Sequence, residues 1–144
     1  MVTRHKIIPA VFLVLMKGDH ILLQRRENTG HGDGKLSLVG GHVDPGEAPV
    51  AALCREAMEE IGIQIQPEDA RCVYTLFRKN DGEERVDTFF MVTQWKGKIT
   101  ILEPQKCSEL AFFSVKRLPS DTLPYIQSTL KNIQRGKIYG EIGW

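Results

Sequence analysis

The stretch from Gly40 to Ile63 reads GGHVDPGEAPVAALCREAMEEIGI and joins a glycine-rich turn to a segment crowded with carboxylates. Good helix formers predominate from Ala48 to Ile61, and this composition predicts a helix. Pro49 is tolerated in the first helical turn, because that turn needs no amide partner, and Gly62 supplies a stop. Apolar residues recur at steps of three and four, which predicts one face packed on a sheet. They are Val50, Leu53, Cys54, Ala57 and Ile61.

Three carboxylates share the other face of this helix. Glu56, Glu59 and Glu60 stand at i, i+3 and i+4, so their side chains reach toward one point. Like charges at this spacing cost a few tenths of a kcal/mol per pair, and a divalent cation would offset that cost. Oxygen ligands of this kind suit Mg²⁺ or Mn²⁺. The alternative, on spacing alone, is a solvated acidic face.

The loop before the helix favours a ligand site. Gly40, Gly41 and Gly46 flank the turn 42–45, and glycines at such a turn let the backbone approach a ligand closely. Glu47 follows at the helix entrance. Arg55 lies two turns later beside the carboxylates, where it is placed to bridge them and fix their rotamers.

From Gly41 onward the pattern resembles the Nudix box. Five free positions separate Gly41 from Glu47 and seven separate Glu47 from Arg55, which is followed by the acid cluster, a glycine and an apolar residue, Ile63. Ala57 departs mildly from the pattern, since bulkier aliphatic residues are more usual at that position of the box. The departure concerns packing and leaves the chemistry intact.

The resemblance implies a Nudix hydrolase with an α/β fold, an α/β/α sandwich in which a mixed β-sheet lies between helices. It implies Mg²⁺ as the cofactor, with Mn²⁺ able to substitute. It also implies a catalytic set and a metal site that share residues. The catalytic set is Glu47, Arg55, Glu56, Glu59 and Glu60, of which Glu47 and Arg55 form a supporting pair. The metal ligands are Glu56, Glu59, Glu60 and the carbonyl of Gly40.

Length and composition bound the remaining possibilities. The 144 residues predict one domain, 1–144, and the net charge of +1 argues against binding a nucleic-acid polymer. The three cysteines are widely spaced, which favours reduced thiols and a cytoplasmic protein. The apolar run near the N-terminus is too short to span a bilayer, so we expect a buried strand and no membrane partner.

Substrate contacts are expected where a predicted hairpin ends. Strands 10–16 and 21–25 flank a polar turn, and the second strand ends in Arg25 and Arg26. Arginine suits phosphate and base contacts, and related enzymes place this strand end at the substrate pocket. The alternative is solubilising charge. Gly41 is a further candidate for substrate binding, as is Phe77, which can stack on a base or pack in the core.

The rest of the chain predicts further strands, a second helix and one more acidic ligand. We expect strands at 35–39, 72–78, 85–95, 97–102 and 110–115, and a helix at 122–134 capped by Ser120 or Asp121. This helix should cover the sheet face opposite the first one. The apolar tail 136–144 should dock on its own chain or on a partner. Glu103 is the first candidate for an additional metal ligand or general base, and Glu109 is the second; a surface acid is the alternative for both.

Residues 103–107, EPQKC, also resemble the mutator-type pyrophosphohydrolase group of the family. The expected reaction converts a nucleoside or deoxynucleoside triphosphate to monophosphate and pyrophosphate. Nucleotide sugars, dinucleoside polyphosphates and other diphosphates are alternative substrates. A nucleotide-binding module without catalysis is the alternative outside the enzyme class, and the intact box acids argue against it. The partner is thus a small-molecule diphosphate, and the resemblance is also compatible with a homodimer.

Overall fold

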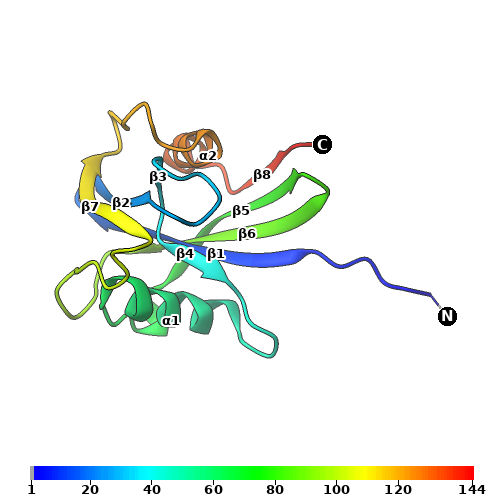
Figure 1. The fold of residues 1–144 in the computed structure, drawn as a ribbon, viewed down its shortest axis with the longest axis horizontal. Coiled ribbons are helices and arrows are strands. Elements are labelled where there is room, and N and C mark those ends of the chain that lie inside the picture. The colour runs from blue at the N-terminus through cyan, green and yellow to red at the C-terminus, as the bar shows by residue number, and fades with distance from the viewer. Residues whose placement is uncertain (1) are drawn as a thin grey trace.

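The computed structural model describes residues 2–144, so Met1 of the predicted domain 1–144 lies outside the described residues. Eight strands form one mixed sheet, with a helix on each side (Figure 1). The strands are β1 (Ile8–Lys17), β2 (His20–Arg26), β3 (Leu36–Ser37), β4 (Gly40–His42), β5 (Arg71–Asn80), β6 (Glu83–Val92), β7 (Cys107–Ser114) and β8 (Tyr139–Ile142). The helices are α1 (Pro49–Ile61) and α2 (Pro124–Gln134), with a short 3₁₀ turn at Pro67–Asp69.

Strand β1 is the centre of the sheet, and its two edges are used differently. One edge pairs in parallel with β6 along eight consecutive residues, from Ile8 opposite Arg85 to Leu15 opposite Val92. The other edge is shared by β4, beside residues 10–12, and by β2, beside residues 16–17. The predicted hairpin is therefore confirmed, but β2 soon diverges from β1 and pairs with β7 instead.

The two helices cover opposite faces of the sheet, as predicted (Figure 1). Val11, Leu13 and Leu15 of β1 pack in the core under α1, whereas the alternate residues Phe12 and Val14 pack in the core under α2. Strand β6 alternates in the same way, with Phe90 toward α1 and Phe89 toward α2. Period-two burial on both faces produces the α/β/α sandwich. Neither helix of residues 2–144 is long and apolar enough to cross a membrane.

The helix that carries Glu56, Glu59 and Glu60 was predicted to within one residue, but the predicted start of the second helix was wrong. Helix α1 ends at Ile61, and the N–H of Gly62 donates to the carbonyl of Ala57. Helix α2 begins at Pro124, and its N-cap residue, Leu123, offers no side-chain hydrogen bond. Asp121 does not cap the helix because its carboxylate accepts a hydrogen bond from Arg25 at 2.6 Å.

The predicted strand at 97–102 was also wrong. This segment crosses the C-terminal end of α1, where Thr100 N–H donates to Ile61 O at 3.0 Å and Leu102 N–H donates to Glu60 O at 3.2 Å. Its amides therefore satisfy orphan helix carbonyls and are not used in a sheet. The strand predicted at 35–39 is reduced to β3, and the one predicted at 85–95 ends at Val92. Trp95 lies beyond that end and stacks on Phe112.

The C-terminal tail docks on its own chain as β8, parallel to β5 (Figure 1). Tyr74 marks the contact, since its hydroxyl accepts a hydrogen bond from Asn132 at 3.0 Å and lies against the backbone of Gly140. A Cβ at position 140 would overlap the Tyr74 hydroxyl. Only glycine fits here without displacing a buried ring.

We expect Gly140→Ala to lower the free energy of unfolding by about 1–3 kcal/mol, the usual range for overpacking a well-packed site. Urea unfolding would measure the loss. The exposed Lys137→Ala is the control in the same tail and should change stability by less than about 0.5 kcal/mol. Equal stability of Gly140→Ala and the parent protein would contradict the docked position of β8.

Candidate active site

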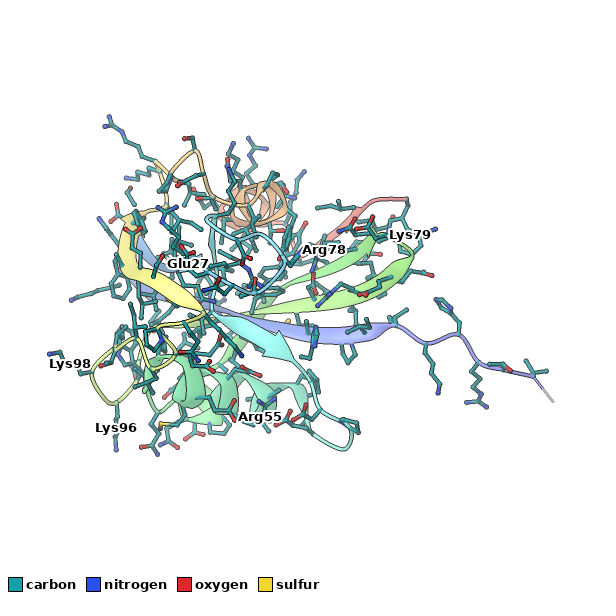
Figure 2. All side chains as sticks on the ribbon, in the orientation of Figure 1. Glu27, Arg55, Arg78, Lys79, Lys96 and Lys98 are labelled. Carbon is teal, nitrogen blue, oxygen red and sulfur yellow. The ribbon has the colours of Figure 1, made fainter. Side chains whose placement is uncertain are left out.

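Arg55 connects the glycine-rich turn to helix α1 through several hydrogen bonds. Its Nε and Nη2 donate to the two carboxylate oxygens of Glu47 at 2.8 and 3.0 Å. Its Nη1 donates to Glu56 at 2.8 Å and to Glu59 at 3.3 Å, and Nη2 also reaches the carbonyl of His42 at 3.2 Å. Figure 2 shows Arg55 on α1, close to the turn that precedes the helix. One guanidinium thus ties the turn to three acids.

Glu47 is held from two directions. Its Oε1 accepts a hydrogen bond from the backbone N–H of Asp44 at 3.0 Å, which closes the turn. Both of its carboxylate oxygens also accept hydrogen bonds from Arg55. The hydrogen bond from Arg55, followed by that from the Asp44 amide, lowers the pKa of Glu47 to about 2. Glu47 is therefore ionised throughout the neutral range.

Glu56 and Glu60 lie deeper than Glu59. Burial raises the pKa of Glu56, and burial together with the nearby charges of Glu56 and Glu103 raises the pKa of Glu60 to about 8. Oε2 of Glu60 is buried and has no hydrogen-bond partner within the described residues. A Cβ at position 41 would overlap the Glu56 carboxylate, so Gly41 is needed for the turn to pass this close to the helix.

The donor chemistry fits a hard divalent cation. Carboxylate oxygens suit Mg²⁺, and the buried Oε2 of Glu60, which has no hydrogen-bond partner among the described residues, is available as a ligand atom. In residues 2–144 no three His, Cys, Asp or Glu side chains are already gathered around one point. Glu59 is 55% exposed and its contact with Arg55 is long, at 3.3 Å, so a change of its side-chain rotamer would let it approach a cation beside Glu60.

A cavity of about 390 Å³ lies beside these acids. Its lining comes from both halves of the sandwich: Glu60 from α1, Glu103 from the loop before β7, and Tyr125 from the first turn of α2. Ala10, Phe12 and Leu38 supply apolar surface, while basic side chains supply donors. The basic lining residues are Arg26, His31, His42, Arg78, Arg85 and Lys106. Such a cavity suits an anionic ligand with an apolar part.

The structure brings some predicted residues together at this cavity. Gly40, Gly41, Glu60, Glu103 and Arg26 all line it. The charge of Glu103 is close enough to Glu60 to contribute to its raised pKa. Glu47, Arg55, Glu56 and Glu59 form the network beside it, through the hydrogen bonds of Arg55.

Three predicted residues lie elsewhere. Arg25 donates to Glu109 at 2.9 Å, to Asp121 at 2.6 Å and to Gly34 O at 2.9 Å, so its donors are already engaged outside the cavity. Glu109 is accordingly the partner of Arg25. Phe77 packs on Tyr139 of β8, with ring centroids 6.0 Å apart, because β8 covers that edge of β5. Neither a substrate contact for Arg25 or Phe77 nor a metal contact for Glu109 follows from these positions.

Most of the residues that line the cavity were not predicted as site residues from the sequence. Among them are Phe12, Gln24, Arg78, Arg85 and Tyr125. A signal existed for two of them: strand alternation puts Arg85 and Asp87 on the same face as the core residue Phe89, and Arg78 lies directly opposite Arg85. Charged residues on a core-facing side of a strand indicate either a buried ion pair or a polar site.

Comparisons with known proteins agree with the geometry. The profile of the NUDIX domain matches residues 6–133. Over 102 residues the chain is 30% identical to an 8-oxo-dGTP diphosphatase of Proteus vulgaris, covering 69% of this chain and 88% of that protein. Over 93 residues it is 33% identical to the 8-oxo-dGTP diphosphatase of Escherichia coli (strain K12), covering 62% of this chain and 67% of that protein.

A more distant relative and a solved structure extend the comparison. The chain is 27% identical over 114 residues to the NAD-capped RNA hydrolase NudC of Citrobacter koseri, covering 79% of this chain but only 42% of that protein. The crystal structure of a MutT NUDIX hydrolase from Burkholderia pseudomallei superposes with a TM-score of 0.80 at 24% identity, covering 88% of this chain and 98% of that one. This likeness confirms the fold.

The Glu47–Arg55 pair predicts a pH-dependent stability. Because the folded-state pKa of Glu47 lies below its ordinary value of 4.5, its ionised form stabilises the fold in full above about pH 4.5, and the stabilisation is lost as pH falls toward about 2. In EDTA, the parent protein should melt at a higher temperature than Glu47→Gln at pH 6, and this difference in melting temperature should shrink progressively as the pH falls below about 4.5.

Thermal unfolding from pH 7 to pH 2.5 measures this gap. The exposed Glu68→Gln is the matched control and should follow the parent protein at every pH. A gap between the parent and Glu47→Gln that stays constant down to pH 2.5 would show that Arg55 does not depress the pKa of Glu47.

Proposed function

Because the chain belongs to the Nudix hydrolase family, we propose that it hydrolyses a phosphoanhydride bond of a nucleoside or deoxynucleoside triphosphate, releasing monophosphate and pyrophosphate. The observation that carries this proposal is the buried, unpartnered carboxylate oxygen of Glu60 at the edge of a cavity that also contains basic and apolar surface. A metal-bound phosphate chain and a nucleoside would occupy these two kinds of surface.

The proposed metal ligands are Glu56, Glu59, Glu60, Glu103 and the carbonyl of Gly40. Bound Mg²⁺, or Mn²⁺ in its place, would neutralise phosphate oxygens and lower the pKa of an attacking water. Oε2 of Glu60 is buried and has no hydrogen-bond partner among the described residues, so a bound cation would complete its interactions. Without a cation the same acids would repel the substrate.

Arg26 is proposed to bind the phosphate chain. Its Nε donates to His31 O at 2.8 Å and its Nη2 donates to Thr29 Oγ1 at 3.1 Å, so the side chain is fixed by the loop after β2. A pre-fixed guanidinium loses little freedom when an anion binds. Arg55 is proposed as a positioning residue, because its contacts are with the acids of the box and the turn.

A larger diphosphate is the second candidate substrate, such as a nucleotide sugar or a dinucleoside polyphosphate. A second cavity of about 450 Å³ adjoins the first and shares His31, Arg78 and Tyr125 with it. A group on the far side of the diphosphate would find room there. The net charge of +1 favours small molecules over a polymer such as the capped RNA for which the NudC relative is named.

Substitution of the buried acid tests the proposed reaction. Glu60→Gln should lower Mg²⁺-dependent turnover by more than about 100-fold, because it removes an anionic metal ligand. Loss of a residue that only supports a metal ligand already lowers activity by about 10- to 100-fold, so loss of the ligand itself should cost more. Turnover is measured as pyrophosphate release from a panel of triphosphates, nucleotide sugars and dinucleoside polyphosphates, with product masses and an EDTA blank.

Glu103→Gln and Glu109→Gln form a matched pair in the same segment. Glu103 lines the cavity and Glu109 pairs with Arg25 outside it, so only the first should reduce turnover strongly. Melting temperatures exclude a folding defect. Near-normal turnover of Glu60→Gln would refute the metal-site assignment, and the absence of turnover on all substrates with Mg²⁺ and Mn²⁺ would favour a binding module.

A further inference from the structure

Arg78 is a buried cation that lines the proposed active-site cavity. Its side chain is only 7% exposed, and it lies near the end of β5, between the sheet and α2 in Figure 2. Its Nε donates to Asp87 at 2.9 Å, and the carboxylate of Asp87 is fully buried. The guanidinium carbon lies 4.1 Å from the ring centroid of Tyr125. An ion pair and an aromatic ring therefore fix both the position and the tilt of the group.

The ion pair leaves donors unused. Asp87 engages Nε, but no acceptor among the described residues takes up the two Nη nitrogens of Arg78. A buried ion pair contributes little stability compared with apolar residues of the same size. The unused donors are better explained by a ligand in the cavity than by the fold.

Arg85 extends this donor surface. It lies directly opposite Arg78 across β5 and β6, and like charges so placed repel one another. Both side chains line the cavity, and Nε of Arg85 is buried without a partner in the described residues. A group rich in acceptor atoms would offset this arrangement.

The surface around Arg78 fits a base better than a phosphate. Ala10, Phe12 and Leu38 line the same cavity and are at most 8% exposed, and Tyr125 adds its ring. A phosphate bound by Arg78 would also lie against this apolar surface, where it would lose water on the sides that face no donor. A nucleobase has apolar faces and a polar edge, so it matches both parts of the lining.

We propose that Arg78 selects the base of the substrate by donating two hydrogen bonds to O6 and N7 of a 6-oxopurine. This inference rests on the proposed function. A guanidinium fork matches that pair of acceptors, which guanine and hypoxanthine present and adenine does not, because adenine carries an amino group at position 6. 8-Oxoguanine carries a hydrogen on N7, so N7 is a hydrogen-bond donor in this base. It would meet an N–H donor of Arg78, and no hydrogen bond would form there. The chain therefore prefers unoxidised guanine nucleotides over the oxidised substrate for which its relatives are named.

The base preference is tested by kcat/KM values at fixed Mg²⁺ for dGTP, dITP, 7-deaza-dGTP, dATP, dCTP and 8-oxo-dGTP. We expect dGTP and dITP to be the best substrates. Replacing N7 by carbon in 7-deaza-dGTP should lower kcat/KM by about 10- to 100-fold, because one donor of a bidentate pair is left without its acceptor. Faster hydrolysis of 8-oxo-dGTP, dATP or dCTP than of dGTP would overturn the proposal.

Arg78→Lys tests the residue itself, since it keeps the charge beside Asp87 but removes the fork. It should lower kcat/KM for dGTP by about 10- to 100-fold. The ratio of kcat/KM for dGTP to kcat/KM for 7-deaza-dGTP should then be close to one. Arg71→Lys, on the exposed start of the same strand, should leave both values unchanged. A purely structural role would instead lower the values for all substrates equally and reduce the melting temperature.

The double variant Arg78→Met/Asp87→Leu removes both charges, so it covers the case in which Arg78→Lys fails to fold. It should also hydrolyse dGTP and 7-deaza-dGTP equally. A retained preference for dGTP in this variant would assign base selection to another residue. If an additional 3′-phosphate on the nucleotide raises kcat/KM and Arg78→Lys abolishes that gain, Arg78 binds phosphate and the proposal is wrong.

A binding assay separates this inference from the proposed function. The shift in melting temperature produced by dGMP and by 7-deaza-dGMP needs no turnover. If the parent protein hydrolyses no triphosphate but binds dGMP more tightly than 7-deaza-dGMP, the proposed reaction fails and the base assignment stands. If it hydrolyses triphosphates but treats the two guanine bases alike in both assays, only the base assignment fails.

Discussion

The geometry of the Nudix box, residues 41–63, depends on the bidentate ion pair between Arg55 and Glu47. It spans the turn and two helical turns of α1, and the same guanidinium neutralises Glu56 and Glu59, which would otherwise repel each other and Glu60. This pairing lets the chain keep several carboxylates on one face of a helix before a cation is bound. Because Glu59 stays exposed, the network remains able to rearrange.

The cavity lies where β1, β2 and β4 come together. Strand β1 pairs with β4 at residues 10–12 and with β2 only at residues 16–17, and Ala10, Gln24 and Gly40 of the three strands all line the cavity. The acids approach from the α1 side, and Phe12 and Tyr125 belong to the α2 side. The cavity therefore lies between the two cores, so the acids of the proposed metal site and the residues of the proposed base site come from different halves of the sandwich.

Local features were predictable from the sequence, whereas partner choice was not. For helix α1, the signals for its beginning, its apolar face and its end all lie within one segment: Pro49, the apolar residues at steps of three and four, and Gly62. Each of these signals is local, so it can be recognised without knowledge of the rest of the fold. The strand expected at 97–102 has a strand-like pattern, but the open carbonyls of α1 recruited its amides. Arg25 and Arg26 were predicted together as substrate contacts, but only Arg26 lines the cavity, because the donors of Arg25 are taken by Glu109 and Asp121, which are distant in sequence. Such pairings depend on the register of β2 with β7.

The part of the cavity proposed to bind the base, around Arg78, is also indicated by the sequence. Arg85 and Asp87 occupy positions where alternation with Phe89 calls for apolar side chains, so they violate the pattern that built the rest of β6. A fold gains no stability from a buried ion pair over a well-packed apolar one, and local rules are usually broken where function requires it. Asp87 holds Arg78 through a hydrogen bond of 2.9 Å, and Arg85 adds a second basic side chain to the same cavity. The two charged residues of β6 therefore have separate roles: Asp87 positions Arg78, and Arg85 extends the donor surface proposed to meet the substrate.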